Sequence, residues 1–178
     1  MTTFVLTAGH SDTDPGAVAD GYTEAKLMTA LRDRTANVLR GWGHTVIEDG
    51  ADGQNLPLQH AISLIPRGAL AVELHTNAAA NPRAAGVETI ALPKLKTFAQ
   101  VLSQQVANQI GTRVRGDRGW IDQSQSARGR LGYVNAGGVI LETFFINNPD
   151  ERAAYFDALD RVAAAIAGTM HGWVGGKP

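Results

Sequence analysis

Apolar runs of strand length alternate with helical patterns along this chain. Residues 3–7, 69–74, 87–92 and 139–145 are mostly apolar and are bounded by turn-forming residues, which is typical of buried strands. Between them, residues 95–110 repeat apolar side chains at helical spacing. The alternation favours a three-layer α/β single domain, with a mostly parallel central sheet flanked by helices.

The length of the chain fits one domain. Its 178 residues can bury a sizeable core, and no repeat or linker interrupts the pattern. We expect the domain to span residues 1–174 and a flexible tail to follow over residues 175–178, which read GGKP. The last helix is expected to begin after Asn148, with Glu151 completing a capping box, and to end near Gly168.

The composition excludes several classes of function. The chain has no cysteine, so thiolate metal sites and cysteine nucleophiles are ruled out, and a metal site would need His, Asp or Glu. A formal net charge of -1 gives no field that would attract nucleic acid. No stretch could span a bilayer and no signal peptide is recognisable, so we expect synthesis in the cytoplasm without membrane insertion. We also expect a monomer.

Polar side chains stand out at or near the ends of the predicted strands. His10 follows the first strand, His75 follows a central strand, and Glu142 lies within the last apolar strand. Glu24 lies in the first turn of the helix that the His10 loop leads into. Because ligands of open α/β sheets bind beyond the carboxyl ends of the strands, we expect these side chains to converge.

Two histidines and one carboxylate suit catalytic zinc, with water as the fourth ligand. A second carboxylate can take a proton from that water and return it to a leaving nitrogen. Glu142 is the natural candidate, since its apolar neighbours would raise its pKa. The spacing alone leaves ordinary roles equally open, because His10 can be a solvated loop residue and Glu24 a partner of the helix dipole.

An ordered set of short motifs resembles one enzyme family. The motifs are residues 7–17, which read TAGHSDTDPGA and precede Glu24, then LHTNA at 74–78, GVE at 86–88 and VILETFFINN at 139–148. In this order they resemble the motifs of zinc-dependent N-acetylmuramoyl-L-alanine amidases of the type 3 amidase family. That family includes bacterial cell-separation amidases and many phage lysis enzymes. The resemblance covers most of the chain.

The resemblance implies that His10, Glu24 and His75 bind Zn²⁺ and that Glu142 is the catalytic acid and base. It implies hydrolysis of the amide between N-acetylmuramic acid and L-alanine, with peptidoglycan as the substrate. We therefore expect a zinc amidase catalytic domain, in an endolysin-like, phage-type lysis enzyme that acts in the periplasm or cell wall. Two alternatives stay open: a zinc peptidase that cuts within the stem peptide, and a non-catalytic wall-binding module.

Three further polar residues are candidates for supporting roles. Glu73 stands where the family usually has a small polar residue, and it can support the metal ligands or pair with an arginine. Asp12 can shape its loop through an Asx turn or orient His10. Asn77, in the second motif, is a candidate contact to the substrate or to the ligands.

Residues 113–130 form a segment rich in arginine, glycine and serine. We expect an exposed loop there, with a short extended piece at its tryptophan. Its side chains can line a groove for sugars and for the carboxylates of peptide stems, or they can belong to an ordinary exposed loop. The candidates are Trp120, Arg113, Arg115, Arg118 and Arg128.

Overall fold

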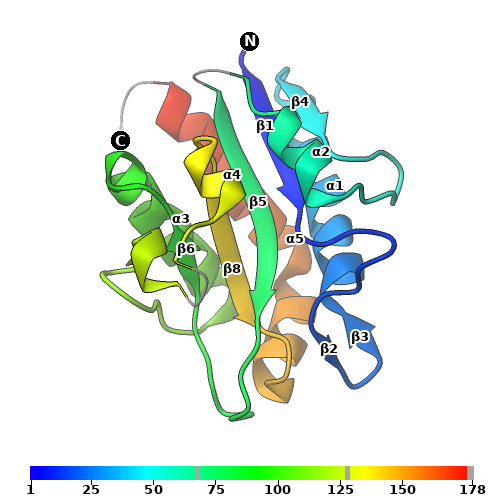
Figure 1. Cartoon of the computed structure of the whole chain (residues 1–178), viewed down its shortest axis with the longest axis vertical. Helices are drawn as coiled ribbons and strands as arrows, with labels where there is room; N and C mark the ends of the chain where they lie inside the picture. Colours follow the sequence, from blue (N-terminus) through cyan, green and yellow to red (C-terminus); the bar gives the residue numbers. More distant parts are fainter. Residues whose placement is uncertain (67–68, 127–128, 176–178) are drawn as a thin grey trace.

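The computed structural model describes residues 1–66, 69–126 and 129–175. Within this part of the chain, strands form a sheet in the order β4-β1-β5-β8-β6-β7 (Figure 1). The first four are parallel, β6 is antiparallel to β8, and β7 is parallel to β6. The predicted, mostly parallel sheet is confirmed. The strands are β1 (Thr3–Ala8), β4 (Thr45–Glu48), β5 (Leu70–Asn77), β6 (Glu88–Ile90), β7 (Trp120–Ile121) and β8 (Val139–Phe145).

Helices cover both faces of this sheet, as the sequence predicts. The long helices α1 (Glu24–Gly41), α3 (Lys96–Ile110) and α5 (Pro149–Val174) pack on one face. The short helices α2 (Leu58–Ser63) and α4 (Gly132–Asn135) lie on the other (Figure 1). None of the described helices is long and apolar enough to cross a membrane. Small elements complete the fold: β2 (Val18–Ala19), β3 (Tyr22–Thr23) and 3-10 turns at Pro93–Leu95 and Gln123–Gln125.

The strand alternation places the ionisable residues of β5 and β8 in one layer. Leu74 and Leu141 are buried in the core beneath the three long helices. Since successive side chains of a strand point to opposite faces, Glu73, His75 and Glu142 point to the face that carries α2 and α4. Those two helices are only 6 and 4 residues long, so they leave room for a cavity beside these polar side chains.

Helix α1 begins as predicted, and its sequence also predicts an apolar face of Leu27, Leu31, Val38 and Trp42, of which the first three pack on the core. Thr23 is its N-cap and accepts a hydrogen bond from the Lys26 amide, and Glu24 occupies the first turn. Trp42 does not belong to this face, because it caps the C-terminus of the helix and its side chain is 49% exposed. The helix also buries a cation completely, Arg32, which donates to Asp49 at 2.7 Å.

Helix α5 corrects two further predictions. Asn148 caps it, accepting hydrogen bonds from the amides of Asp150 and Glu151, but Glu151 does not complete a capping box. Its carboxylate accepts instead from the amides of Gly86 and Phe145, and so ties the helix to β8 and to the loop before β6. The helix continues past the predicted end to Val174. Of the predicted tail, residues 176–178 lie outside the described part.

Candidate active site

A cavity of about 900 Å³ opens where β1, β5 and β8 end. His10, from the loop after β1, and Glu24, from the first turn of α1, line it from one side. His75 and Glu142 line it from the sheet, where they are Cα partners in the β5–β8 register. The structure therefore brings together the four residues that the sequence singled out.

The side chains of His10, Glu24 and His75 converge closely. The Nε2 atom of His10 lies 3.0 Å from Oε2 of Glu24, and Nδ1 of His75 lies 2.9 Å from Oε1 of Glu24. One nitrogen or oxygen atom from each residue lies within 4.8 Å of the others, so the set could hold a metal ion. Glu24 is almost fully buried, whereas both imidazoles are partly exposed to the cavity.

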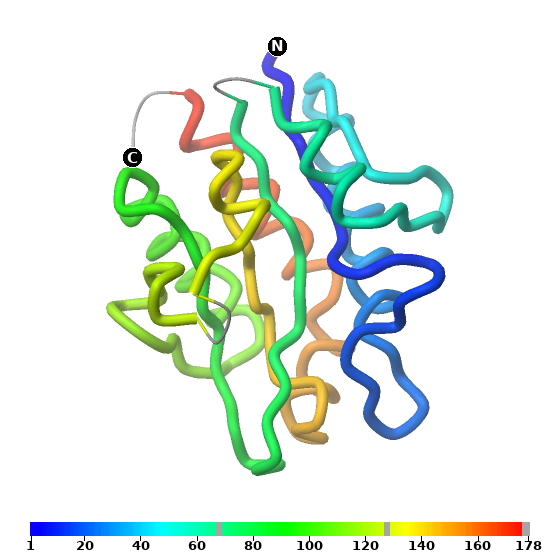
Figure 2. The backbone as a smooth tube through the Cα atoms, in the orientation of Figure 1, coloured from blue at the N-terminus to red at the C-terminus, as the bar shows by residue number. Residues whose placement is uncertain are grey.

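Two glycines permit this close approach. A Cβ atom on Gly9 would lie 2.2 Å from Cε1 of His75, and one on Gly16 would lie 2.5 Å from Cδ2 of His10. His10 itself has a φ of 66°, a conformation that is sparsely populated outside glycine and concentrates at functional sites. The loop after β1 also runs beside residues 49–56 (Figure 2), where the Asp12 amide donates to the Asn55 carbonyl at 2.9 Å.

Each histidine has a carboxylate at its other ring nitrogen. Nδ1 of His10 lies 2.9 Å from Oδ2 of Asp14, and Nε2 of His75 lies 3.2 Å from Oε2 of Glu73. Such partners fix the tautomer and the orientation of a ligating imidazole. Of the two roles open to Asp12, the orienting one falls to Asp14, since Asp12 accepts from the Asn55 amide instead.

The electrostatics of the cluster keep Glu24 ionised. Burial alone would raise the pKa of Glu24, but hydrogen bonds from His10 and His75 outweigh it and hold that pKa well below its usual range. The same hydrogen bond to Glu24 raises the pKa of His10. Burial lowers the pKa of His75, yet the carboxylates of Glu24 and Glu73 bring it above the ordinary value. An anionic carboxylate between two imidazoles suits a divalent cation.

Glu142 lies beside this cluster in a different environment. Its Oε2 atom is buried and has no hydrogen-bond partner among the described residues. Burial raises the pKa of Glu142 to about 7; the positive charge of His75 opposes this, and the negative charges of Glu24 and Glu88 add to it. A carboxyl group with a pKa near neutrality can both accept and return a proton at physiological pH.

Hydrogen bonds connect three residues on the far wall of the cavity, and this group was not identified from the sequence. Asn77 donates to Oε1 of Glu88 at 2.9 Å, and Arg115 donates from Nε to Oε2 of Glu88 at 2.6 Å. Glu88 could have been noticed as a second charged residue in an apolar strand. Trp120 does not line this cavity and donates instead to the Ala91 carbonyl. Arg128 lies outside the described residues.

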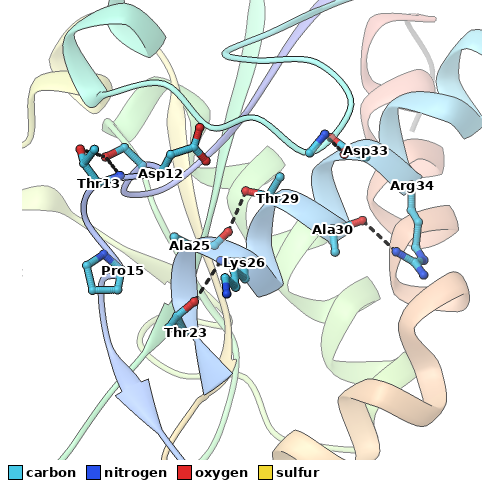
Figure 3. Close-up of a pocket in the computed structure, with 12 residues that line it drawn as sticks. Asp12, Thr13, Pro15, Thr23, Ala25, Lys26, Thr29, Ala30, Asp33 and Arg34 are labelled. Carbon is cyan, nitrogen blue, oxygen red and sulfur yellow. Dashed lines mark hydrogen bonds between the residues drawn. The ribbon is translucent and has the colours of Figure 1, made fainter. Parts of the chain in front are cut away.

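A second cavity, of about 590 Å³, lies along the outer side of α1 (Figure 3). Its wall includes charged side chains of both signs, among them Asp12, Lys26, Asp33 and Arg34. Figure 3 shows that several of its polar side chains, such as Thr29, bond to the helix backbone. Because none of the four convergent residues lines it, the chemistry belongs to the larger cavity.

The fold and the convergent side chains define a hydrolase site at the carboxyl edge of an α/β sheet. Residues 4–171 match the family model of the N-acetylmuramoyl-L-alanine amidases, so the chain belongs to this family. No curated relative matches the sequence. Membership gives the activity, which is hydrolysis of the N-acetylmuramoyl–L-alanine amide in cell-wall peptidoglycan.

Solved structures agree with this assignment. A Neisseria meningitidis chain assigned as an N-acetylmuramoyl-L-alanine amidase is 41% identical, with a TM-score of 0.89 over 97% of this chain and 96% of that one. The catalytic domain of the amidase CwlV from Bacillus (Paenibacillus) polymyxa var. colistinus is 24% identical, with a TM-score of 0.84 over 99% and 100% of the two chains. An amidase from Clostridium difficile 630 is 21% identical, with a TM-score of 0.83 over 99% and 98%. The last two show the fold alone.

Proposed function

We propose that this amidase uses Zn²⁺ held by His10, Glu24 and His75, with Glu142 as its catalytic acid and base. The observation that carries the proposal is the convergence of three ligand atoms within 4.8 Å beside the unpartnered, buried oxygen of Glu142. With these three protein ligands, a bound zinc ion would keep one coordination position for water or substrate, as catalytic rather than structural zinc sites do.

The donor set fits zinc by its chemistry. Two imidazole nitrogens and one carboxylate oxygen are ligands that zinc accepts, and the cysteine-free chain offers no softer ones. When bound, zinc lowers the pKa of a water molecule toward about 7 and polarises the carbonyl group to be attacked. Glu73 and Asp14 hold the outer nitrogens of the two histidines and so orient the nitrogens that face Glu24.

Glu142 carries the proton. Its carboxylate takes a proton from the attacking water and delivers it to the amide nitrogen of L-alanine, which then leaves as a neutral amine. The pKa of about 7 serves both steps, because the group is neither too acidic to accept the proton nor too basic to release it. The unpartnered Oε2 atom is free for this transfer, since no described residue holds it.

Other aspects of the function stay predictions. A domain boundary at residue 174 is consistent with the family match over residues 4–171. The 24% identity to the catalytic domain of an endolysin, CD27L, speaks for the fold alone, so a phage lysis role rests on the sequence motifs. The location in the periplasm or cell wall and the monomeric state also stay predictions from the sequence. A cut within the stem peptide is the second candidate function, because the same chemistry would serve it.

Replacing Glu142 tests the proposed mechanism. We expect Glu142→Gln to bind one metal ion per chain, as the wild type does, and to lose about 10²- to 10⁴-fold in kcat, the range typical of a positioned acid or base. Glu48→Gln is the matched control, since Glu48 lies on the edge strand β4 and does not line the cavity. A Glu142→Gln variant that turned over substrate like this control would rule out the mechanism.

A further inference from the structure

Arg115 is held rigidly at the wall of the catalytic cavity. Its Nε atom donates to Oε2 of Glu88 at 2.6 Å, and its guanidinium carbon lies 4.9 Å from the centroid of the Phe145 ring. Its backbone amide also donates to the Val87 carbonyl at 2.9 Å, which fixes the segment beside β6. An arginine restrained by an ion pair and by an aromatic ring loses little further entropy on binding a ligand.

The terminal nitrogens of Arg115 remain available for a ligand. Within the described residues, the structure gives them no hydrogen-bond acceptor, and the side chain is 35% exposed. Glu88, its partner, is occupied on both oxygens, because Oε1 accepts from Asn77 and Oε2 from Arg115. The ion pair therefore uses the Nε atom of the guanidinium. The two terminal nitrogens stay available and can form two parallel hydrogen bonds with a carboxylate.

The charges around the cavity suggest a role for the terminal guanidinium nitrogens of Arg115. Among the described residues that line the cavity, Arg115 is the single arginine or lysine, whereas Asp14, Glu24, Glu73, Glu88 and Glu142 all contribute carboxyl groups. An anionic group of a substrate would be repelled by these carboxylates unless a cation received it. Arg113, two residues away, is exposed and donates to the Ala85 carbonyl outside the cavity.

The position of Arg115 suits the part of the substrate that follows the scissile amide. Glu88 and Glu142 are directly opposite in the antiparallel β6–β8 pair, an arrangement in which Cα atoms lie about 4.5–5.5 Å apart. The guanidinium bonded to Glu88 is therefore within reach of about two or three residues of extended peptide from the acid and base. In peptidoglycan, L-alanine is followed by a γ-linked D-glutamate whose α-carboxyl group is free in some walls and amidated in others.

We propose that Arg115 binds the free α-carboxylate of this second stem residue and so makes the enzyme selective for walls in which it is not amidated. The inference rests on the proposed amidase site and adds a subsite to it. Glu88 and Phe145 act as positioning residues, since they hold the guanidinium at its Nε atom and against an aromatic ring. A charged hydrogen-bonded pair of this kind supports a preference of about 10- to 100-fold for the carboxylate over the amide.

The test uses two soluble muramoyl tripeptides that differ only in carrying D-glutamate or D-isoglutamine at the second position. We expect the wild type to show a kcat/KM ratio of about 10 to 100 in favour of D-glutamate. In Arg115→Gln that ratio should fall to about 1, while Arg115→Lys keeps part of it, because lysine retains the charge but not the fork geometry. Arg113→Gln is the matched control and should keep the wild-type ratio. The metal content of each variant shows whether its metal site is still formed.

Two results would overturn the subsite while leaving the amidase intact. One is a wild-type ratio near 1, and the other is an Arg115→Gln variant that loses activity equally on both tripeptides. The proposed function fails differently: both the wild type and Arg113→Gln would then release no L-alanine-terminated peptide from either tripeptide, or would cut within the stem.

Discussion

Glu73 offers a sharp test of how the proposed histidine ligands are supported. Its side chain is 3% exposed and lies 3.2 Å from Nε2 of His75, whereas Asp14 is 64% exposed and lies 2.9 Å from Nδ1 of His10. Both carboxylates occupy the same chemical position, on the outer nitrogen of a proposed metal ligand. They differ in burial, so the strength of their electrostatic effect should differ as well.

We expect Glu73→Gln to weaken zinc binding about 10- to 100-fold, the usual cost of losing a carboxylate partner of a metal-bound histidine, which equals about 1.4–2.7 kcal/mol. Asp14→Asn should cost only a few-fold, because water and salt screen an exposed carboxylate. The measurement is zinc affinity by competition with a chromophoric chelator at fixed pH and ionic strength. Affinity within about two-fold of wild type for Glu73→Gln, or a larger loss for Asp14→Asn, would refute the reasoning.

Two further predictions concern stability and pH. Asp49→Ala should lower the free energy of unfolding by about 3 kcal/mol or more, because it removes a carboxylate 2.7 Å from the fully buried Arg32; denaturant titration measures this. Zinc affinity should fall as pH drops, because carboxylate neighbours raise the pKa of His10 and His75, so protons compete with the metal at a higher pH than for a free imidazole. Zinc titrations at several pH values measure this, with about two protons released per metal at acid pH.

Each of these predictions has a contradicting result. For Asp49→Ala, a loss below about 1 kcal/mol would mean that Arg32 is satisfied by its other acceptors, among them Asp33 and the Gln54 carbonyl. Replacing both Arg32 and Asp49 by apolar residues is the control, since it removes the buried charge together with its partner. A zinc affinity that does not change between about pH 5 and pH 8 would argue against histidine ligands.

The fold was predictable because its signals are local. Apolar runs with single polar interruptions identified β1, β5 and β8, and the period of two in β5 explains why Glu73 shares a face with His75. Strand ends also located His10 and His75, since parallel strands present their carboxyl ends at one edge. What the sequence does not carry is the register that makes His75 and Glu142 direct neighbours.

The remaining differences arise from tertiary contacts. Asp14 rather than Asp12 is the partner of His10, and His10 has a φ of 66°, a backbone conformation that is uncommon outside glycine. Trp42 is apolar and at helical spacing, yet it lies at the end of α1 and is 49% exposed, whereas Arg32 is fully buried. A buried cation is unexpected from sequence, because two of the acceptors that offset its cost, Asp49 and the Gln54 carbonyl, come from a distant segment.

The Arg115 subsite illustrates the same limit. The arginine-rich segment was recognisable, but its members are equivalent by composition, and only the packing of β6 against β8 singles out Arg115. The ion pair with Glu88 joins residues that are 27 positions apart. Pairing of this kind follows from the sheet, not from any spacing within the segment.

The most direct test of the central claim is digestion of purified peptidoglycan, followed by mass spectrometry of the products. Three samples are compared: untreated protein, protein treated with a chelator, and the treated protein after addition of zinc. We predict stem peptides with a free N-terminal L-alanine, absent after chelation and restored by zinc. Products cut within the stem, or digestion that survives complete removal of the metal, would contradict the account.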